Sequence, residues 1–256
     1  YAAARTSFSN DEFTFLMCSS MSVFLIVSLP FQRLSFRLTW QSCLAILLVV
    51  VCKMFEFQMS VRVLKQLSAF ELKAWLGLTL FASYFTDILV GSKLSISKLI
   101  CIFITTTGLI FIARSVKDGS VDYKQIIIPL CLYLLSKYGY GLVIRSFSPY
   151  VSATMQLLPA MIIISLIMLV RVHVRELIKK DRSSVVKVVL ARIPNTLGML
   201  LENAVISISL VDYSFIQPMI LVMLFVIGLI RREKRSRLNL VGSIICVMGI
   251  VAFQLI

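Results

Sequence analysis

Residues 1–13, YAAARTSFSNDEF, resemble residues 140–151 of the same chain, YGLVIRSFSPYV. The tripeptide SFS at positions 7–9 aligns with the SFS at positions 146–148, an offset of 139 positions. Self-similarity at a fixed offset is the sequence signature of an internal duplication. This pair of segments therefore indicates that the chain contains two copies of one unit.

The offset continues through the rest of the chain. The segment SAFE at 68–71 aligns with SLVD at 209–212, an offset of 141 positions. The same offset relates Ser95 to Ser236, Leu99 to Leu240 and Gly108 to Gly249. Because the matches keep their order, we predict a first repeat over 1–114, a linker over 115–124 and a second repeat over 125–256.

Apolar residues dominate both copies. Of the 256 residues, 59% are hydrophobic and 15% are charged, and the mean hydropathy is +0.95. A soluble domain has about 45–50% apolar and about 25% charged residues, so the composition excludes a cytosolic enzyme, a disordered chain and a secreted disulfide scaffold. A membrane span takes about 20 residues, which leaves room for spans and short loops but not for a separate catalytic domain.

Apolar runs separated by charged breaks predict an all-α, polytopic membrane protein. Ser9 with Glu12 three residues later predicts a capping box, and Ser148 before Pro149 predicts an N-cap with proline at the first helical position. The predicted helices cover 12–31, 38–59, 66–89, 95–114, 125–145, 149–170, 187–206, 209–230 and 238–256.

The second repeat holds five of these helices and the first holds four. Residues 1–5 resemble the last turn of a further helix, so we expect that the first helix of the first repeat is largely missing from this chain. Five helices per repeat give the second copy the opposite orientation in the membrane, which relates the two copies by an in-plane two-fold axis. Inverted repeats of this kind are typical of alternating-access transporters with a binding site near the midplane.

The segment before the last helix of each repeat carries a recurring motif. The motif consists of an acidic residue, a small polar residue and two glycines. In the second copy these are Glu233, Ser236, Gly242 and Gly249. The first copy has Ser95 and Gly108 at the matching positions and departs from the pattern at Ser92 and Cys101. A proline in the helix predicted at 209–230, Pro218, accompanies the motif.

With these motifs the chain resembles the drug/metabolite transporter superfamily, in its EamA-like form of ten helices. The resemblance covers essentially the whole chain. It implies a secondary carrier of small organic metabolites, in many members an exporter, that has no ATPase activity.

Ionisable residues at membrane depth usually face the bundle interior or an aqueous cavity. Glu202 and Asn203 lie deep in the helix predicted at 187–206, where positions 195, 198, 202 and 209 share one face of polar and small residues. We predict that Glu202 and Asn203 line the substrate site. The alternative is a glutamate buried against a neighbouring backbone or lysine.

Two further acidic positions come from the predicted first repeat. Glu56 lies on one helical face with Lys53 and is predicted to bind substrate, although the two could simply neutralise each other as an intrahelical pair. Glu71 is paired with Asp212 by the duplication, and both are predicted site residues. The alternative for this pair is stabilisation by the helix macrodipole, because both lie in the first turn of a predicted helix.

Three more candidates complete the predicted substrate-binding set. Lys137 and Tyr140 share a face of the helix predicted at 125–145, where tyrosine could instead belong to an interfacial belt and the lysine could snorkel towards the helix end. Gln217 precedes Pro218, and a proline leaves a backbone carbonyl unpaired one turn earlier. The whole predicted set is Glu56, Glu71, Lys137, Tyr140, Glu202, Asn203, Asp212 and Gln217.

These residues favour a secondary-active carrier of a small polar or zwitterionic metabolite, such as an amino acid or an amine, with Glu202 or Glu56 as a candidate proton-coupling group. The alternatives are a flippase of a lipid-linked substrate and a non-transporting membrane scaffold. No enzyme activity is expected. The predicted partners are the small-molecule substrate and membrane lipids, with no cofactor, no metal and no nucleic acid; the oligomeric state stays open.

Cysteine and histidine offer no metal-ligand spacing. His173 is the single histidine, and no two cysteines form a CxxC pair, so we expect the cysteines to be small buried apolar residues. The six cysteines are Cys18, Cys43, Cys52, Cys101, Cys131 and Cys246.

The net charge of +14 comes from lysines and arginines in the breaks between apolar runs. This placement is typical of topology determinants and of contacts to anionic lipid headgroups, rather than of a nucleic-acid surface. Most of these residues lie in the breaks at 62–65, 114–124, 171–187 and 231–237, all on one predicted side. The positive-inside rule puts that side in the cytoplasm, whereas the family resemblance implies the reverse orientation in a plasma or inner membrane; we follow the charge rule.

Overall fold

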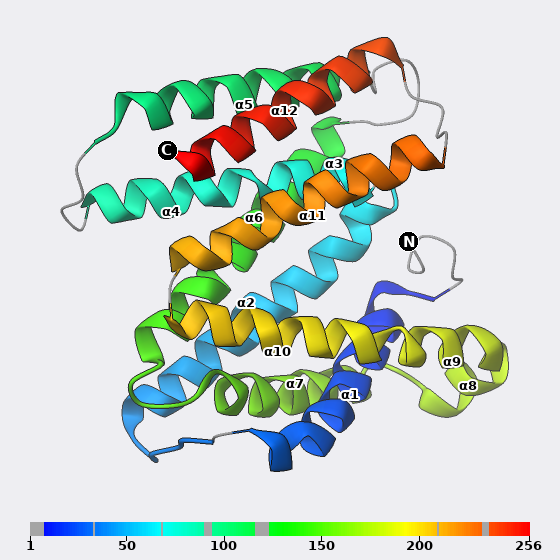
Figure 1. Cartoon of the computed structure of the whole chain (residues 1–256). Coiled ribbons are helices and arrows are strands. Elements are labelled where there is room, and N and C mark those ends of the chain that lie inside the picture. The colour runs from blue at the N-terminus through cyan, green and yellow to red at the C-terminus, as the bar shows by residue number, and fades with distance from the viewer. Residues whose placement is uncertain are drawn as a thin grey trace. The chain divides into compact units, whose positions relative to one another are not determined.

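The computed structural model describes residues 8–32, 34–67, 69–89, 94–115, 123–208, 210–231 and 236–256. These residues are almost entirely helical, and the β-type pairing among them is one isolated bridge between Phe36 and Val151. The all-α class is therefore confirmed for the described part of the chain. The elements in Figure 1 are α1 Asn10–Ser28, η2 Leu29–Phe31, α2 Trp40–Leu64, α3 Ala69–Leu76, α4 Leu78–Leu89, α5 Ile96–Ser115, α6 Tyr123–Phe147, α7 Ala153–Leu169, α8 Val174–Lys180, α9 Arg182–Leu190, α10 Arg192–Ile208, α11 Leu210–Ile230 and α12 Arg237–Leu255.

Several of these helices are long and apolar enough to cross a membrane, as judged by length and composition. In the described ranges three shorter apolar helices accompany them: Ile96–Ile112, Ala153–Leu169 and Ile220–Ile230. The candidate spans are Asn10–Phe31, Trp40–Leu64, Lys124–Phe147, Arg182–Ile206 and Arg237–Leu255. The helices are thus compatible with a membrane protein.

The predicted capping box at the start of α1 is confirmed. The Glu12 N–H donates to Ser9 Oγ at 3.2 Å, and the Ser9 N–H donates to Glu12 Oε2 at 2.6 Å. These two bonds satisfy backbone donors that the first helical turn cannot pair internally.

The predicted helix start at Ser148 and Pro149 is wrong. Residues 148–150 form a turn, and α7 begins at Ala153. The Ser152 N–H donates at 2.9 Å to the carbonyl of Ser35, which lies in the loop before α2. This long-range pairing holds Val151 and Ser152 extended, so tertiary contact overrides the local proline signal.

Other predicted boundaries also shift. The helix predicted at 38–59 continues to Leu64, and the helix predicted at 66–89 divides at Gly77 into α3 and α4, because glycine weakens a helix interior. The helix α8 was not predicted, and the helix predicted at 187–206 begins earlier, at Arg182, and divides at Ala191 into α9 and α10. Asp181 caps α9 by accepting a hydrogen bond from the Ser184 N–H at 2.9 Å, and hydrogen bonds from Ser184 lower the pKa of the Asp181 carboxyl.

The chain folds as two compact units, Tyr1–Lys65 with Pro129–Leu210 and Gln66–Ile128 with Val211–Ile256. Each unit combines segments from both halves of the chain. In the first unit α1 packs against α7, α2 and α10. Met21 and Leu25 of α1 and Met161 and Ile164 of α7 are fully buried there.

In the second unit α5 and α12 lie side by side and run in opposite directions (Figure 1). A Cβ atom added to Gly108 would lie 2.6 Å from the backbone nitrogen of Cys246 and 2.8 Å from the carbonyl oxygen of Gly242. A Cβ atom on Gly249 would strike the Thr105 hydroxyl. Small residues are therefore what lets these two backbones approach, as in many membrane helix pairs.

Candidate functional site

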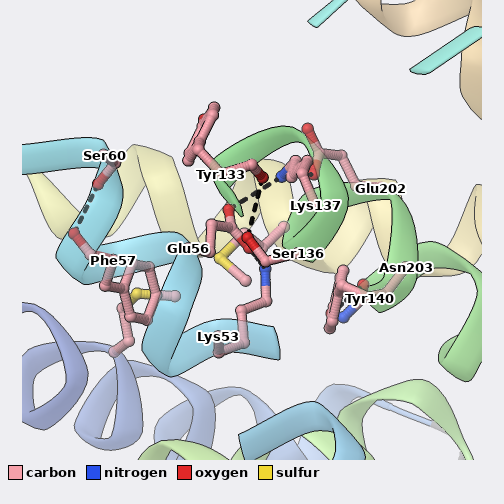
Figure 2. A network of polar contacts seen from close by, with 12 residues as sticks. Lys53, Glu56, Phe57, Ser60, Tyr133, Ser136, Lys137, Tyr140, Glu202 and Asn203 are labelled. Carbon is pink, nitrogen blue, oxygen red and sulfur yellow. Dashed lines mark hydrogen bonds and ion pairs between the residues drawn. The ribbon is translucent and has the colours of Figure 1, made fainter. Parts of the chain in front are cut away.

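Three helices of the first unit bring their polar residues together. The helix α2 supplies Lys53 and Glu56, which are three positions apart and share a face. Figure 2 shows these side chains with those of α6 and α10 around them. The members from α6 are Lys137 and Tyr140, and those from α10 are Glu202 and Asn203.

Ion pairs connect the four charged side chains. Lys53 Nζ lies 2.7 Å from Glu56 Oε2, within α2. Lys137 Nζ lies 3.4 Å from Glu56 Oε1 and 3.5 Å from Glu202 Oε2 (Figure 2). Lys137 is thus shared between carboxylates on two different helices, and the two lysines balance the two glutamates in charge.

Tyr140 joins the same group through both its ring and its hydroxyl. The hydroxyl donates to Asn203 Oδ1 at 2.6 Å. The ammonium of Lys53 lies 3.6 Å from the centroid of the Tyr140 ring, well within the range of a cation–π interaction. Lys53 therefore has one ionic partner on its own helix and one aromatic partner on α6.

Four of the six residues of the group are buried, and Lys137 and Glu202 are half-buried. Counted over the whole residue, Lys53 and Tyr140 are 0% exposed, Asn203 is 2% exposed and Glu56 is 7% exposed. Burying a charge is costly unless it is paired and hydrogen-bonded, and the ion pairs above supply that pairing. The amide of Asn203 is only partly satisfied, because no acceptor among the described residues takes the hydrogens of its Nδ2. An unmet buried donor of this kind costs about 1–3 kcal/mol.

Five of the eight sequence-predicted residues meet in this group: Glu56, Lys137, Tyr140, Glu202 and Asn203. Glu71 is buried in α3 and belongs to the second unit. Asp212 and Gln217 fall on α11, and their side chains lie outside the described residues. Participation of these last three in the site stays a prediction.

The structure tests two of the alternative interpretations. The intrahelical pair of Lys53 and Glu56 is confirmed, but it does not set Glu56 apart from the group, because Glu56 also pairs with Lys137. Snorkelling of Lys137 towards the helix end is wrong, since its side chain is 11% exposed and pairs within the group. Lys53 is not in the set predicted from sequence. The signal for it was its position three residues before Glu56, in the middle of an apolar helix.

Metal or thiol chemistry finds little support in the described ranges. No group of three or more His, Cys, Asp and Glu residues is arranged there to hold a metal ion. The expectation that all six cysteines are buried is wrong: Cys43 and Cys131 are exposed and Cys52 is half-buried. Cys43 and Cys131 lie on outward-facing parts of α2 and α6, which periodicity within an apolar run does not distinguish from the core.

Comparison with known proteins adds no assignment. Neither a scan against protein-family models nor a search of curated proteins finds a match to this chain. Function is therefore argued from the arrangement of Lys53, Glu56, Lys137, Tyr140, Glu202 and Asn203.

Proposed function

We propose that the chain is a multi-pass membrane protein that carries a small polar or zwitterionic metabolite by secondary-active, alternating-access transport. The largely buried group of two lysines, two glutamates, a tyrosine and an asparagine carries the proposal. Lys53, Glu56 and Lys137 lie near the middle of helices that are long and apolar enough to span a membrane. Charges at that depth are costly in free energy and usually mark a substrate or ion pathway. A membrane scaffold needs no such pathway.

Contacts between α5 and α12 support an inverted duplication. Gly108 contacts Cys246. The 141-position offset pairs Gly108 with Gly249 and Cys246 with Thr105, and the contact of Gly249 with Thr105 is also observed. The contact of Gly108 with Gly242 likewise becomes that of Cys101 with Gly249, where the added Cβ lies 3.2 Å from the Cys101 oxygen. A contact set that maps onto itself between antiparallel helices is what a two-fold axis would produce. The offset pairs Cys101 with Gly242, Thr105 with Cys246 and Gly108 with Gly249.

The same offset relates the two helices that supply the carboxylates. Residues 40–64 of α2 correspond to 181–205, which cover α9 and most of α10. Glu56 and Glu202 would then come from equivalent helices of the two repeats and meet at Lys137. A binding site between inverted repeats is the arrangement of many secondary transporters, and it agrees with the sequence resemblance to EamA-like drug/metabolite transporters.

We expect Glu202→Gln to lower the initial rate of transport by roughly 10- to 100-fold. A charge-assisted hydrogen bond contributes about 1.5–3 kcal/mol, and about 1.4 kcal/mol is a tenfold change. The measurement is counterflow of a labelled mixture of neutral L-amino acids into proteoliposomes that contain the purified protein.

The matched control is Glu176→Gln, which makes the same chemical change at an exposed position on α8. It should transport at the unmodified rate. Equal rates for the Glu202 and Glu176 variants would contradict the role of Glu202. Movement of labelled lipid across the bilayer, without counterflow of the amino acids, would favour a flippase instead.

A second prediction concerns orientation. Exposed basic residues lie on or just before α8 and α9, and the positive-inside rule assigns them to the cytoplasm. They are Arg171, Arg175, Lys179, Arg182 and Lys187. A Lys179→Cys variant, with the native cysteines replaced, should resist an impermeant maleimide in intact cells and react once the cells are opened. Reaction in intact cells would support the opposite orientation, which the family resemblance implies.

A further inference from the structure

The two carboxylates of the buried group are not equally provided with cations. Glu56 faces two ammonium groups, Lys53 at 2.7 Å and Lys137 at 3.4 Å. Among the described residues Glu202 faces one, Lys137, at 3.5 Å, and that lysine is shared with Glu56. The Glu202 side chain is also the more exposed of the two, at 17% against 9%. The Lys137–Glu202 contact is therefore the part of the group most open to exchange.

Asn203 adds unused hydrogen-bonding capacity next to Glu202. Its Oδ1 accepts from the Tyr140 hydroxyl, and no described acceptor takes the hydrogens of Nδ2. Turning the amide over would only exchange the unpaired atom, because a tyrosine hydroxyl contacts one end of the amide. Tyr140 is three positions after Lys137 on α6, so this amide and the carboxylate of Glu202 approach the same face of α6.

We propose that Lys137 Nζ holds the place of a solute cation at Glu202, and that Glu202 thereby determines the charge class of the solute. The inference rests on the proposed function, because it takes this group to be the solute site. A solute ammonium replaces Lys137 at Glu202, and the solute carboxylate pairs with the displaced Lys137 and with Asn203 Nδ2. Lys137 stays close to Glu56 throughout, so the ion pair between α6 and α10 is the one that solute binding opens.

Charge balance makes this selective. The group holds two cations and two anions, so a solute with one charge of each sign leaves it neutral. An amine alone, or a carboxylate alone, leaves a buried charge without a partner, and such a charge is strongly unfavourable. The same reasoning predicts that neutralising Glu202 changes which solute fits, rather than only weakening binding.

The experiment is a ligand-binding series on the purified full chain in detergent, read as the shift in thermal unfolding midpoint. The probes are L-leucine, L-serine and L-phenylalanine, each compared with its amine lacking the carboxyl group and its acid lacking the amino group. At millimolar concentration at least one of the amino acids should raise the midpoint by roughly a few °C, and its amine and acid should not. Equal shifts for amino acid, amine and acid, or no shift with any amino acid, overturn the inference.

Glu202→Gln supplies a readout that a purely structural role would not produce. Without the anion at position 202, the acid lacking the amino group should now raise the midpoint, and the amino acid should no longer do so. Glu176→Gln should keep the preference of the unmodified protein. An unchanged preference in Glu202→Gln overturns the inference; if that variant fails to fold, the series on the unmodified protein decides alone.

The outcome is separable from that of the proposed function, because binding is measured without transport. Selective binding of a zwitterion by a protein that moves none of the labelled amino acids supports the inference and contradicts the carrier. Transport of an amine or an acid without binding of any amino acid supports the carrier and contradicts the inference.

Discussion

Replacing Glu56 by leucine should lower the free energy of unfolding by about 3–5 kcal/mol, because it removes one partner of a buried ion pair. Lys53, which is fully buried, would lose its only carboxylate within ion-pair distance among the described residues. It would keep the aromatic rings of Tyr140 and Phe57. For a chain of this length the change corresponds to a fall in midpoint on the order of 10 °C. Thermal unfolding of the purified protein in detergent measures it.

The control removes both charges together. The double variant Lys53→Met with Glu56→Leu leaves no buried lysine unpaired on α2, and replacing a buried pair by apolar residues of similar size is often neutral. Lys137 keeps Glu202 in that variant. Its midpoint should therefore return most of the way to that of the unmodified protein. A single variant as stable as the double one would contradict the assignment of Glu56 as the counter-charge of Lys53.

Gly108→Ala should destabilise the second unit by about 1–3 kcal/mol, the usual cost of forcing an extra carbon into a packed interior. The added Cβ would meet backbone atoms of α12, which cannot rotate away as a flexible side chain can. Gly249→Ala should cost a similar amount, because the two glycines occupy equivalent places in the proposed duplication. The measurement is again the thermal midpoint in detergent.

Gly198→Ala is the matched control, on α10 of the first unit. Apart from its chain neighbours and the nearby backbone of its own helix, no atom of the described residues lies within 4 Å of the position that a Cβ on Gly198 would take. Alanine favours a helix over glycine by up to about 1 kcal/mol, so this variant should be as stable as the unmodified protein or slightly more stable. If the Gly108 variant has the same thermal midpoint as the Gly198 variant, the close approach of α5 and α12 is contradicted.

Local sequence was enough to predict the helical class and several features of single helices. Ser9 and Glu12 form the predicted capping box because both partners lie within one turn. Lys53 and Glu56 form the predicted pair for the same reason, since the spacing of three positions places them on one face. Local signals failed where a distant segment competed, as at Pro149, where the loop before α2 holds Val151 and Ser152 extended.

The composition and periodicity of the chain by themselves determined that it is a set of apolar helices with a few deeply placed charges. Only the tertiary structure decided which of those charges meet. Helical periodicity specifies the face of a helix on which Glu56, Lys137 or Glu202 lies, but not the helix that this face contacts. That choice depends on how α2, α6 and α10 pack, and packing is determined by the summed fit of many side chains distant in sequence. The sharing of Lys137 between two glutamates, and the position of Lys53 over the Tyr140 ring, follow from that packing.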